Sequence, residues 1–361
     1  MKIKKFLLAI ILIAFALTYS VAAESMQNEM QQTLPDIPNF SGYELLEDYG
    51  LTLENENWVQ NLTPKNVFQI FKELILNGYK QPLSAFLMVT AAIITTAAFS
   101  SFLNENQHFF SLLVVAVAAT TLLPLFATLE GAANTLSAVA NFMLSFVPIF
   151  IGIVISSGFI TTASTTSPLL LFVATVVSKV STSTFLPLMG GYLSLTISGS
   201  ISPIFSLNSF ANSIKNAANY IMGLVTTLFL GVLSIGGTVT SATDSLALKT
   251  TRFLVSGVPV VGGAIAESLT ATTASIEVLK SGVGAFGILA VVVILLPILV
   301  TLLLWKAALF LSSFISEVLD VKVLSSFLNA VGAVVSVTIG VLIFVGILFI
   351  IGLTILIRLR R

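Results

Sequence analysis

The chain has 361 residues, of which 56% are hydrophobic and only 9% are charged, with 16 basic residues against 16 acidic ones. Soluble domains are about 45–50% apolar and about 25% charged, so this composition excludes an ordinary soluble enzyme and a disordered protein and predicts a polytopic membrane protein. No basic patch is available to meet phosphates, which argues against nucleic-acid binding. Cysteine is absent and His108 is the single histidine, which excludes disulfides, thiol catalysis and a multi-histidine metal centre.

The first 23 residues have the features of a secretory signal peptide. Three lysines within the first five residues precede an apolar run over 6–17, and Val21 and Ala23 occupy positions −3 and −1 of a signal-peptidase site. The run is too short to span about 30 Å of hydrocarbon comfortably. We therefore expect cleavage after Ala23, with an uncleaved anchor as the alternative. In both cases the following residues are expected outside the cytoplasm.

Residues 24–81 differ in composition from the rest of the chain. They hold nine acidic residues and three lysines, a net charge of −6, and prolines and glycines interrupt their first half. From Pro64 onward apolar residues recur at steps of three and four, which predicts an amphipathic helix with Thr63 as its N-cap. We interpret this part as an acidic extracytoplasmic segment. A solvated tether and a docking segment both remain open.

Residues 82–361 form the predicted polytopic transmembrane domain. Seven apolar segments are predicted to span the membrane, at 83–102, 109–129, 136–160, 167–189, 218–236, 283–305 and 331–357. A polar turn is expected at 104–108, and an irregular or re-entrant segment at 190–217. An odd number of spans places the C-terminal arginines in the cytoplasm, as the positive-inside rule requires. If 168–200 forms two half-helices instead, the loops after it change sides.

Lys179 is the charged residue that falls within the predicted fourth span. A lone lysine at mid-span costs about 2.5–3.5 kcal/mol on insertion scales, and its Ser and Thr neighbours suggest a hydrated path. Alternatively, the span ends near Val177 and the lysine reaches the interface. Prolines within spans, at Pro124, Pro148 and Pro297, predict kinks. The many Ser and Thr residues indicate helix packing or, alternatively, a pore lining.

The segment 237–282 is predicted to be an amphipathic hairpin. A short helix capped by Thr243-Asp244 carries Lys249 and Arg252, and an apolar elbow at 258–263 follows it. A second helix then places Glu267 and two other polar residues on one face. This arrangement is typical of an interfacial or re-entrant segment. The elbow lacks the Lys-Ser/Thr of a phosphate loop.

Within this segment the chain resembles a known family. It is similar to stage III sporulation protein AE of endospore-forming bacteria at Arg252-Phe253, at Val258-Pro259-Val260-Val261-Gly262-Gly263, at Glu267, Thr270 and Lys280, and at the glycines up to Gly287. The signal peptide, the acidic segment and the span count agree with the resemblance, which covers most of the chain. No catalytic residue is carried over by it.

The resemblance implies a role in a multi-protein complex. Such proteins are encoded with a secretion-type ATPase, small membrane proteins and ring-forming proteins of the space between mother cell and forespore. With a forespore membrane protein they form a channel-like complex that supports the engulfed forespore. The expected location is the mother-cell membrane around the forespore, with the N-terminus in the intermembrane space. Expected partners are other stage III sporulation membrane and ring-forming proteins and the lipid bilayer, and no nucleic acid.

The sequence thus predicts a non-enzymatic, all-α membrane subunit that acts as a permease-like core or an assembly platform. No Ser/His pair, Asp pair or metal cluster lies at membrane depth, and no cofactor is implied. The alternative is an independent secondary transporter, although the spans lack the repeated Asp or Glu of a proton- or sodium-coupled carrier. The candidates for interaction or gating are Arg252, Pro259, Gly262, Gly263, Glu267, Lys280 and Lys179.

Overall fold

The structure is a computed structural model that describes residues 64–100, 107–201 and 262–357 and the single positions 216, 220, 227 and 231. Every element in the three ranges is helical. The helices are α3 (Pro64–Gly78), α4 (Lys80–Ser100), α5 (Gln107–Ser156), α6 (Ile160–Val180), the π-helical turn η2 (Ser181–Phe185), α7 (Leu186–Ile201), α9 (Gly262–Val318) and α10 (Lys322–Ile357). The predicted signal peptide, most of the acidic segment and all but three positions of the predicted fifth span lie outside the described residues.

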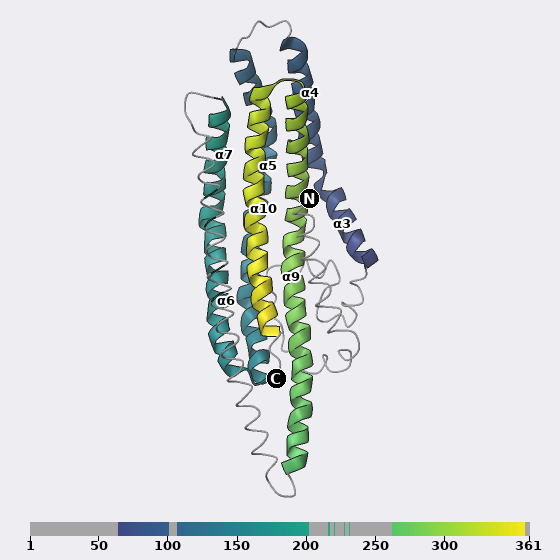
Figure 1. Cartoon of the computed structure of the whole chain (residues 1–361), viewed down its shortest axis with the longest axis vertical. Coiled ribbons are helices and arrows are strands. Elements are labelled where there is room, and N and C mark those ends of the chain that lie inside the picture. The colour runs from purple at the N-terminus through teal and green to yellow at the C-terminus, as the bar shows by residue number, and fades with distance from the viewer. Residues whose placement is uncertain are drawn as a thin grey trace.

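The core is an elongated bundle in which α9 packs antiparallel to both α5 and α10 (Figure 1). A Cβ on Gly131 of α5 would lie 3.2 Å from Ile298 of α9, whereas one on Gly287 of α9 would lie 2.4 Å from Phe146. The paired positions therefore run in opposite directions along the two helices. The same holds for α10, because a Cβ on Gly346 would lie 2.7 Å from Leu295, whereas one on Gly284, earlier on α9, would lie 2.4 Å from Ile357, later on α10.

The α6–η2–α7 rod completes the bundle and packs on α5 and α10. Gly352 of α10 faces Leu170 of α6, and the Thr338 hydroxyl of α10 lies 3.6 Å from the Met189 sulfur of α7. The helices α3 and α4 lie at the edge of the bundle, where they contact α9 (Figure 1). Helix α3 lies in the region where the sequence predicted an amphipathic helix.

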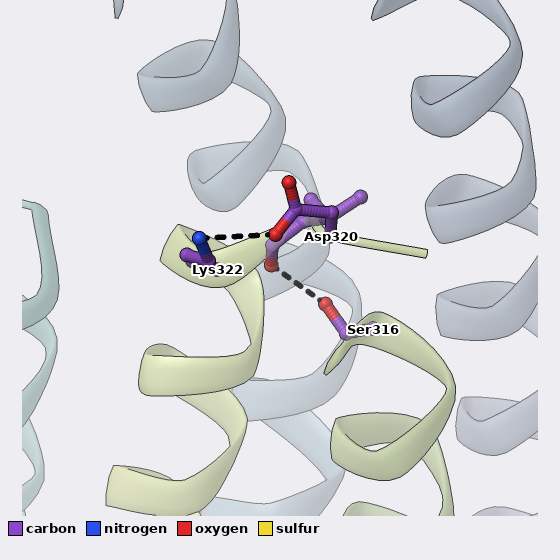
Figure 2. A network of polar contacts seen from close by, with 4 residues as sticks. Ser316, Asp320 and Lys322 are labelled. Atoms are coloured by element: carbon purple, nitrogen blue, oxygen red, sulfur yellow. Dashed lines mark hydrogen bonds and ion pairs between the residues drawn. The ribbon is translucent and has the colours of Figure 1, made fainter. Parts of the chain in front are cut away.

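The turn between α9 and α10 is closed by backbone hydrogen bonds of the Schellman type. The N–H of Asp320 donates to the Glu317 carbonyl at 3.1 Å, and the N–H of Val321 donates to the Ser316 carbonyl at 2.9 Å. Asp320 adopts a φ of 57°, a left-handed conformation that aspartate tolerates better than most residues. Figure 2 shows the Ser316 hydroxyl and the Asp320–Lys322 ion pair at this turn. Both charged side chains are exposed, so the ion pair adds little stability.

Five of the described helical segments are long and apolar enough to cross a membrane, namely Lys80–Ala98, Thr121–Ser156, Ile160–Val180, Lys280–Val318 and Lys322–Ile357. The outward face of α4 is largely apolar. The exposed residues of this helix between Leu83 and Ala98 fall within one arc of about 140° at 100° per residue. Large exposed side chains on such a face fit contact with lipid better than contact with water.

Three predicted boundaries are wrong. The predicted second and third spans are parts of α5, which continues through Glu130 because the Gly-Ala-Ala that follows contains no proline and the glutamate is exposed. Residues 190–201 are helical rather than irregular. Gly262 and Gly263 are the first residues of α9 and not part of a non-helical elbow, and the second amphipathic helix is continuous with the sixth span.

Hydroxyl side chains within the helices mostly bond to their own helix. Thr96, Thr121 and Ser157 each donate to the carbonyl four residues earlier, at 2.6–2.9 Å. This arrangement satisfies the hydroxyl hydrogen where water is absent.

Candidate functional site

Lys280 is the predicted site residue that the structure places most distinctively. Its side chain is only 1% exposed, and its Nζ lies 4.6 Å from the centroid of the Phe159 ring. A cation over an aromatic face within about 6 Å is attracted by the ring, by up to about 2 kcal/mol when both groups are desolvated. Lys280 therefore links α9 to the start of α6.

The sharp turn between α5 and α6 positions Phe159. Gly158 has a φ of 91°, a left-handed conformation that favours glycine. Its N–H donates to the Ile155 carbonyl at 2.8 Å, and the N–H of Phe159 donates to the Val154 carbonyl at 3.3 Å, which is the Schellman pattern. The chain reverses at this glycine, and Phe159 is fully buried against the bundle.

Next to Lys280, two glycines bring α9 into close contact with α5 and α10. A Cβ on Gly284 would lie 2.4 Å from Ile357 Cγ1 and 2.8 Å from Phe150 Cζ. On α5 the rings of Phe142, Phe146 and Phe150 stack in sequence, with centroids 5.1 and 5.6 Å apart. The glycines of α9 and the phenylalanines of α5 thus form complementary surfaces at the end of the bundle where α10 ends.

The other predicted site residues do not join this cluster. Glu267 lies thirteen residues before Lys280 on α9, which is about 20 Å along the helix. Lys179 is exposed and lies near the end of α6, about 30 Å along that helix from Phe159. Gly262 and Gly263 begin α9. Arg252 and Pro259 lie outside the described residues.

The sequence analysis did not single out Phe159 or the aromatic residues of α5. Two signals were present: phenylalanines at steps of four on α5, and Gly284 and Gly287 three residues apart on α9. Such spacings place each set on one face of its helix. The cluster around Lys280 contains an ammonium, aromatic rings and glycines, and these groups fix helix positions rather than make or break bonds.

A family model described as Stage III sporulation protein AE matches residues 47–359. The chain belongs to this family. The match includes every helix described above, and it confirms the resemblance seen around residues 252–287. The chain is therefore a sporulation protein of the stage III AE family, and the part that the structure describes is helical, with five segments apolar enough to cross a membrane.

A curated relative gives the same family. Stage III sporulation protein AE of Bacillus subtilis (strain 168) is 25% identical over 158 residues, which cover 44% of this chain and 40% of the relative. The similarity thus spans less than half of that stage III AE protein. No solved structure matches the chain.

Proposed function

We propose that this chain is a non-enzymatic membrane subunit of the channel complex between mother cell and forespore, with a role as permease-like core or assembly platform. The observation that carries the proposal is the family match over 47–359. The five helical segments that are long and apolar enough to cross a membrane, with the apolar outward face of α4, support a membrane location.

We further propose an orientation in the mother-cell membrane that surrounds the forespore. The N-terminus would face the intermembrane space, and the arginines after Ile357 would face the cytoplasm. Lys280 would then lie near the cytoplasmic end, because Gly284, one turn away, contacts Ile357. Other stage III membrane and ring-forming proteins would be the partners. An independent transporter would gain support from a buried Lys179, whereas this side chain is exposed.

The proposal predicts that the chain acts only with partners. Affinity-tagged chain purified from membranes of sporulating cells is expected to carry other stage III sporulation proteins. The chain purified alone and inserted into phospholipid vesicles is expected to move no solute. Quantitative mass spectrometry and a solute-uptake assay check the two expectations. Accumulation of a solute by the isolated chain, without copurified sporulation proteins, would instead support the independent transporter.

A further inference from the structure

Two helical hairpins that run in opposite directions form the core of the bundle. The first hairpin is α5 followed by α6, η2 and α7, and it reverses at Gly158. The second is α9 followed by α10, and it reverses at Asp320. Each turn has a left-handed residue followed by a buried apolar one, Phe159 or Val321. The two turns lie at opposite ends of the bundle, so the hairpins are inverted relative to each other (Figure 1).

The first helix of each hairpin carries the same short sequence pattern. The segments are Pro-Leu-Phe-Ala-Thr-Leu at 124–129 in α5 and Pro-Ile-Leu-Val-Thr-Leu at 297–302 in α9. In each segment the threonine hydroxyl donates to the proline carbonyl four residues earlier, at 2.9 Å for Thr128 and at 3.0 Å for Thr301. The leucine that ends each segment is fully buried. The two segments thus agree in sequence, in hydrogen bonding and in burial.

The two segments also lie at the same level of the bundle. Gly131 of α5 lies against Ile298 of α9, and these helices are antiparallel. Three residues back along α5 and three residues forward along α9 lead to Thr128 and Thr301, which therefore lie at about the same height. A two-fold axis across the bundle at this height approximately exchanges the two hairpins. Inverted repeats of this kind are typical of membrane carriers, in which one repeat moves against the other.

The proline of each segment is a point at which its helix can bend. Pro124 and Pro297 have no N–H, so each helix lacks one backbone hydrogen bond there. Along α9, Pro297 and Lys280 are about 25 Å apart. A change of about 20° in the kink at Pro297 would therefore move Lys280 by about 9 Å. That displacement exceeds the distance of about 6 Å within which a cation–ring contact holds.

Contacts between the two hairpins hold the end of the bundle where α10 ends. Lys280 of the second hairpin lies 4.6 Å from the centroid of the Phe159 ring, at the turn of the first hairpin. A Cβ on Gly352 of α10 would lie 2.3 Å from Leu170 Cδ2 of α6. These contacts separate if the hairpins bend apart, whereas contacts within one hairpin do not.

We propose that these contacts between the hairpins form a gate, which opens when the hairpins bend apart at their prolines. The inference rests on the proposed function and deepens it, because a moving gate assigns the chain to the permease-like core and not to the assembly platform. In the proposed orientation the gate closes the cytoplasmic end, and this structure is its closed state. Lys280 is a positioning residue of the gate, held over the Phe159 ring by an attraction that is weak enough to be broken and remade.

A disulfide across the gate tests the proposal, because the chain has no cysteine of its own. Leu170→Cys with Gly352→Cys places two thiols on facing hairpins, where loss of the leucine makes room for the new Cβ. Ser313→Cys with Ser325→Cys is the matched control, because these hydroxyl oxygens lie 3.2 Å apart between α9 and α10 of one hairpin. Each pair replaces the host's own copy. A mild oxidant forms the disulfide after engulfment, and a reductant cleaves it.

We expect both disulfides to form and only the one between the hairpins to block sporulation. With Leu170→Cys and Gly352→Cys oxidised, the yield of heat-resistant spores is expected to fall to that of a strain without the chain, and reductant is expected to restore it. With Ser313→Cys and Ser325→Cys oxidised, the yield is expected to equal that of the reduced variant. Membrane content and spore yield of the reduced variants show that the substitutions themselves are tolerated.

A second measurement does not depend on sporulation. Leu170 is 0% exposed in the closed state, so a polar thiosulfonate reagent reaches Leu170→Cys only when the gate opens. We expect slow labelling in isolated membranes, and labelling several-fold slower when Pro297→Ala is added, because alanine restores the backbone hydrogen bond and stiffens α9. Pro148→Ala is the control, because this proline of α5 is followed four residues later by glycine and not by threonine. We expect it to leave the labelling rate unchanged.

Normal spore yield with the disulfide between the hairpins formed would overturn the gate, since the hairpins would not need to separate. An equal loss of yield with the control disulfide would also overturn it, because any restraint would then be harmful. Failure of Leu170→Cys and Gly352→Cys to join would contradict the contact between α6 and α10, and absence of labelling at Leu170→Cys would contradict opening at this end. In each case a strain without the chain can still fail to form spores, so failure of the gate is distinct from failure of the proposed function.

Discussion

The substitution Lys280→Glu is expected to leave little folded protein in the membrane. It puts a carboxylate where an ammonium, 1% exposed, lies 4.6 Å from the Phe159 ring centroid. The ring face is electron-rich and repels an anion. An uncompensated charge in a buried site costs about 3–5 kcal/mol, a large part of a total stability of about 5–15 kcal/mol. The measurements are the amount of membrane-inserted protein and the thermal midpoint of the solubilised chain.

Two variants separate charge from packing at this position. Lys280→Met keeps most of the side-chain length and puts no charge against the ring, so we expect a smaller loss than for Lys280→Glu, of which the cation–ring attraction accounts for about 2 kcal/mol or less. Lys322→Ala removes an exposed lysine whose ion pair with Asp320 is also exposed, and we expect a change within about 0.5 kcal/mol. A Lys280→Glu protein as stable as the Lys322→Ala protein would show that Lys280 is not buried against Phe159.

The substitution Gly287→Ala is expected to destabilise the bundle although alanine favours helices. The new Cβ would lie 2.4 Å from Phe146 Cε1 and 2.5 Å from Cζ. The Phe146 ring is stacked between the rings of Phe142 and Phe150, so it cannot move aside freely. Overpacking of this kind costs about 1–3 kcal/mol. The measurement is the thermal midpoint of the solubilised protein.

Gly332→Ala provides a control of opposite sign. No atom lies within 4 Å of a Cβ at this position on α10. Alanine is better than glycine in a helix interior by about 0.5–1 kcal/mol, so we expect a small stabilisation. If both substitutions raise the thermal midpoint, Gly287 of α9 does not lie in close contact with Phe146 of α5.

The sequence allowed the prediction of the helical class and of several helix positions. Apolar residues at steps of three and four located α3, and hydrophobic runs located the parts of α4, α9 and α10 that can cross a membrane. Helix length was harder to predict, because an exposed Glu130 interrupts an apolar pattern without interrupting a helix. A hydropathy pattern therefore separated segments that the backbone joins within α5.

The candidate site was harder to predict, because it is formed by contacts between parts of the chain that are distant in sequence. The family resemblance directed attention to Lys280, but its partner Phe159 lies 121 residues earlier and follows a turn that Gly158 makes possible. The sequence offered no direct signal that these two side chains meet.

Forespore size and heat-resistant spore yield in a deletion strain of the host test the central claim most directly. We predict that engulfment completes, that the forespore then shrinks or stalls, and that few heat-resistant spores form. A plasmid copy of the chain should restore both. Normal forespore size and normal spore yield in the deletion strain would contradict a role as a subunit of the channel complex.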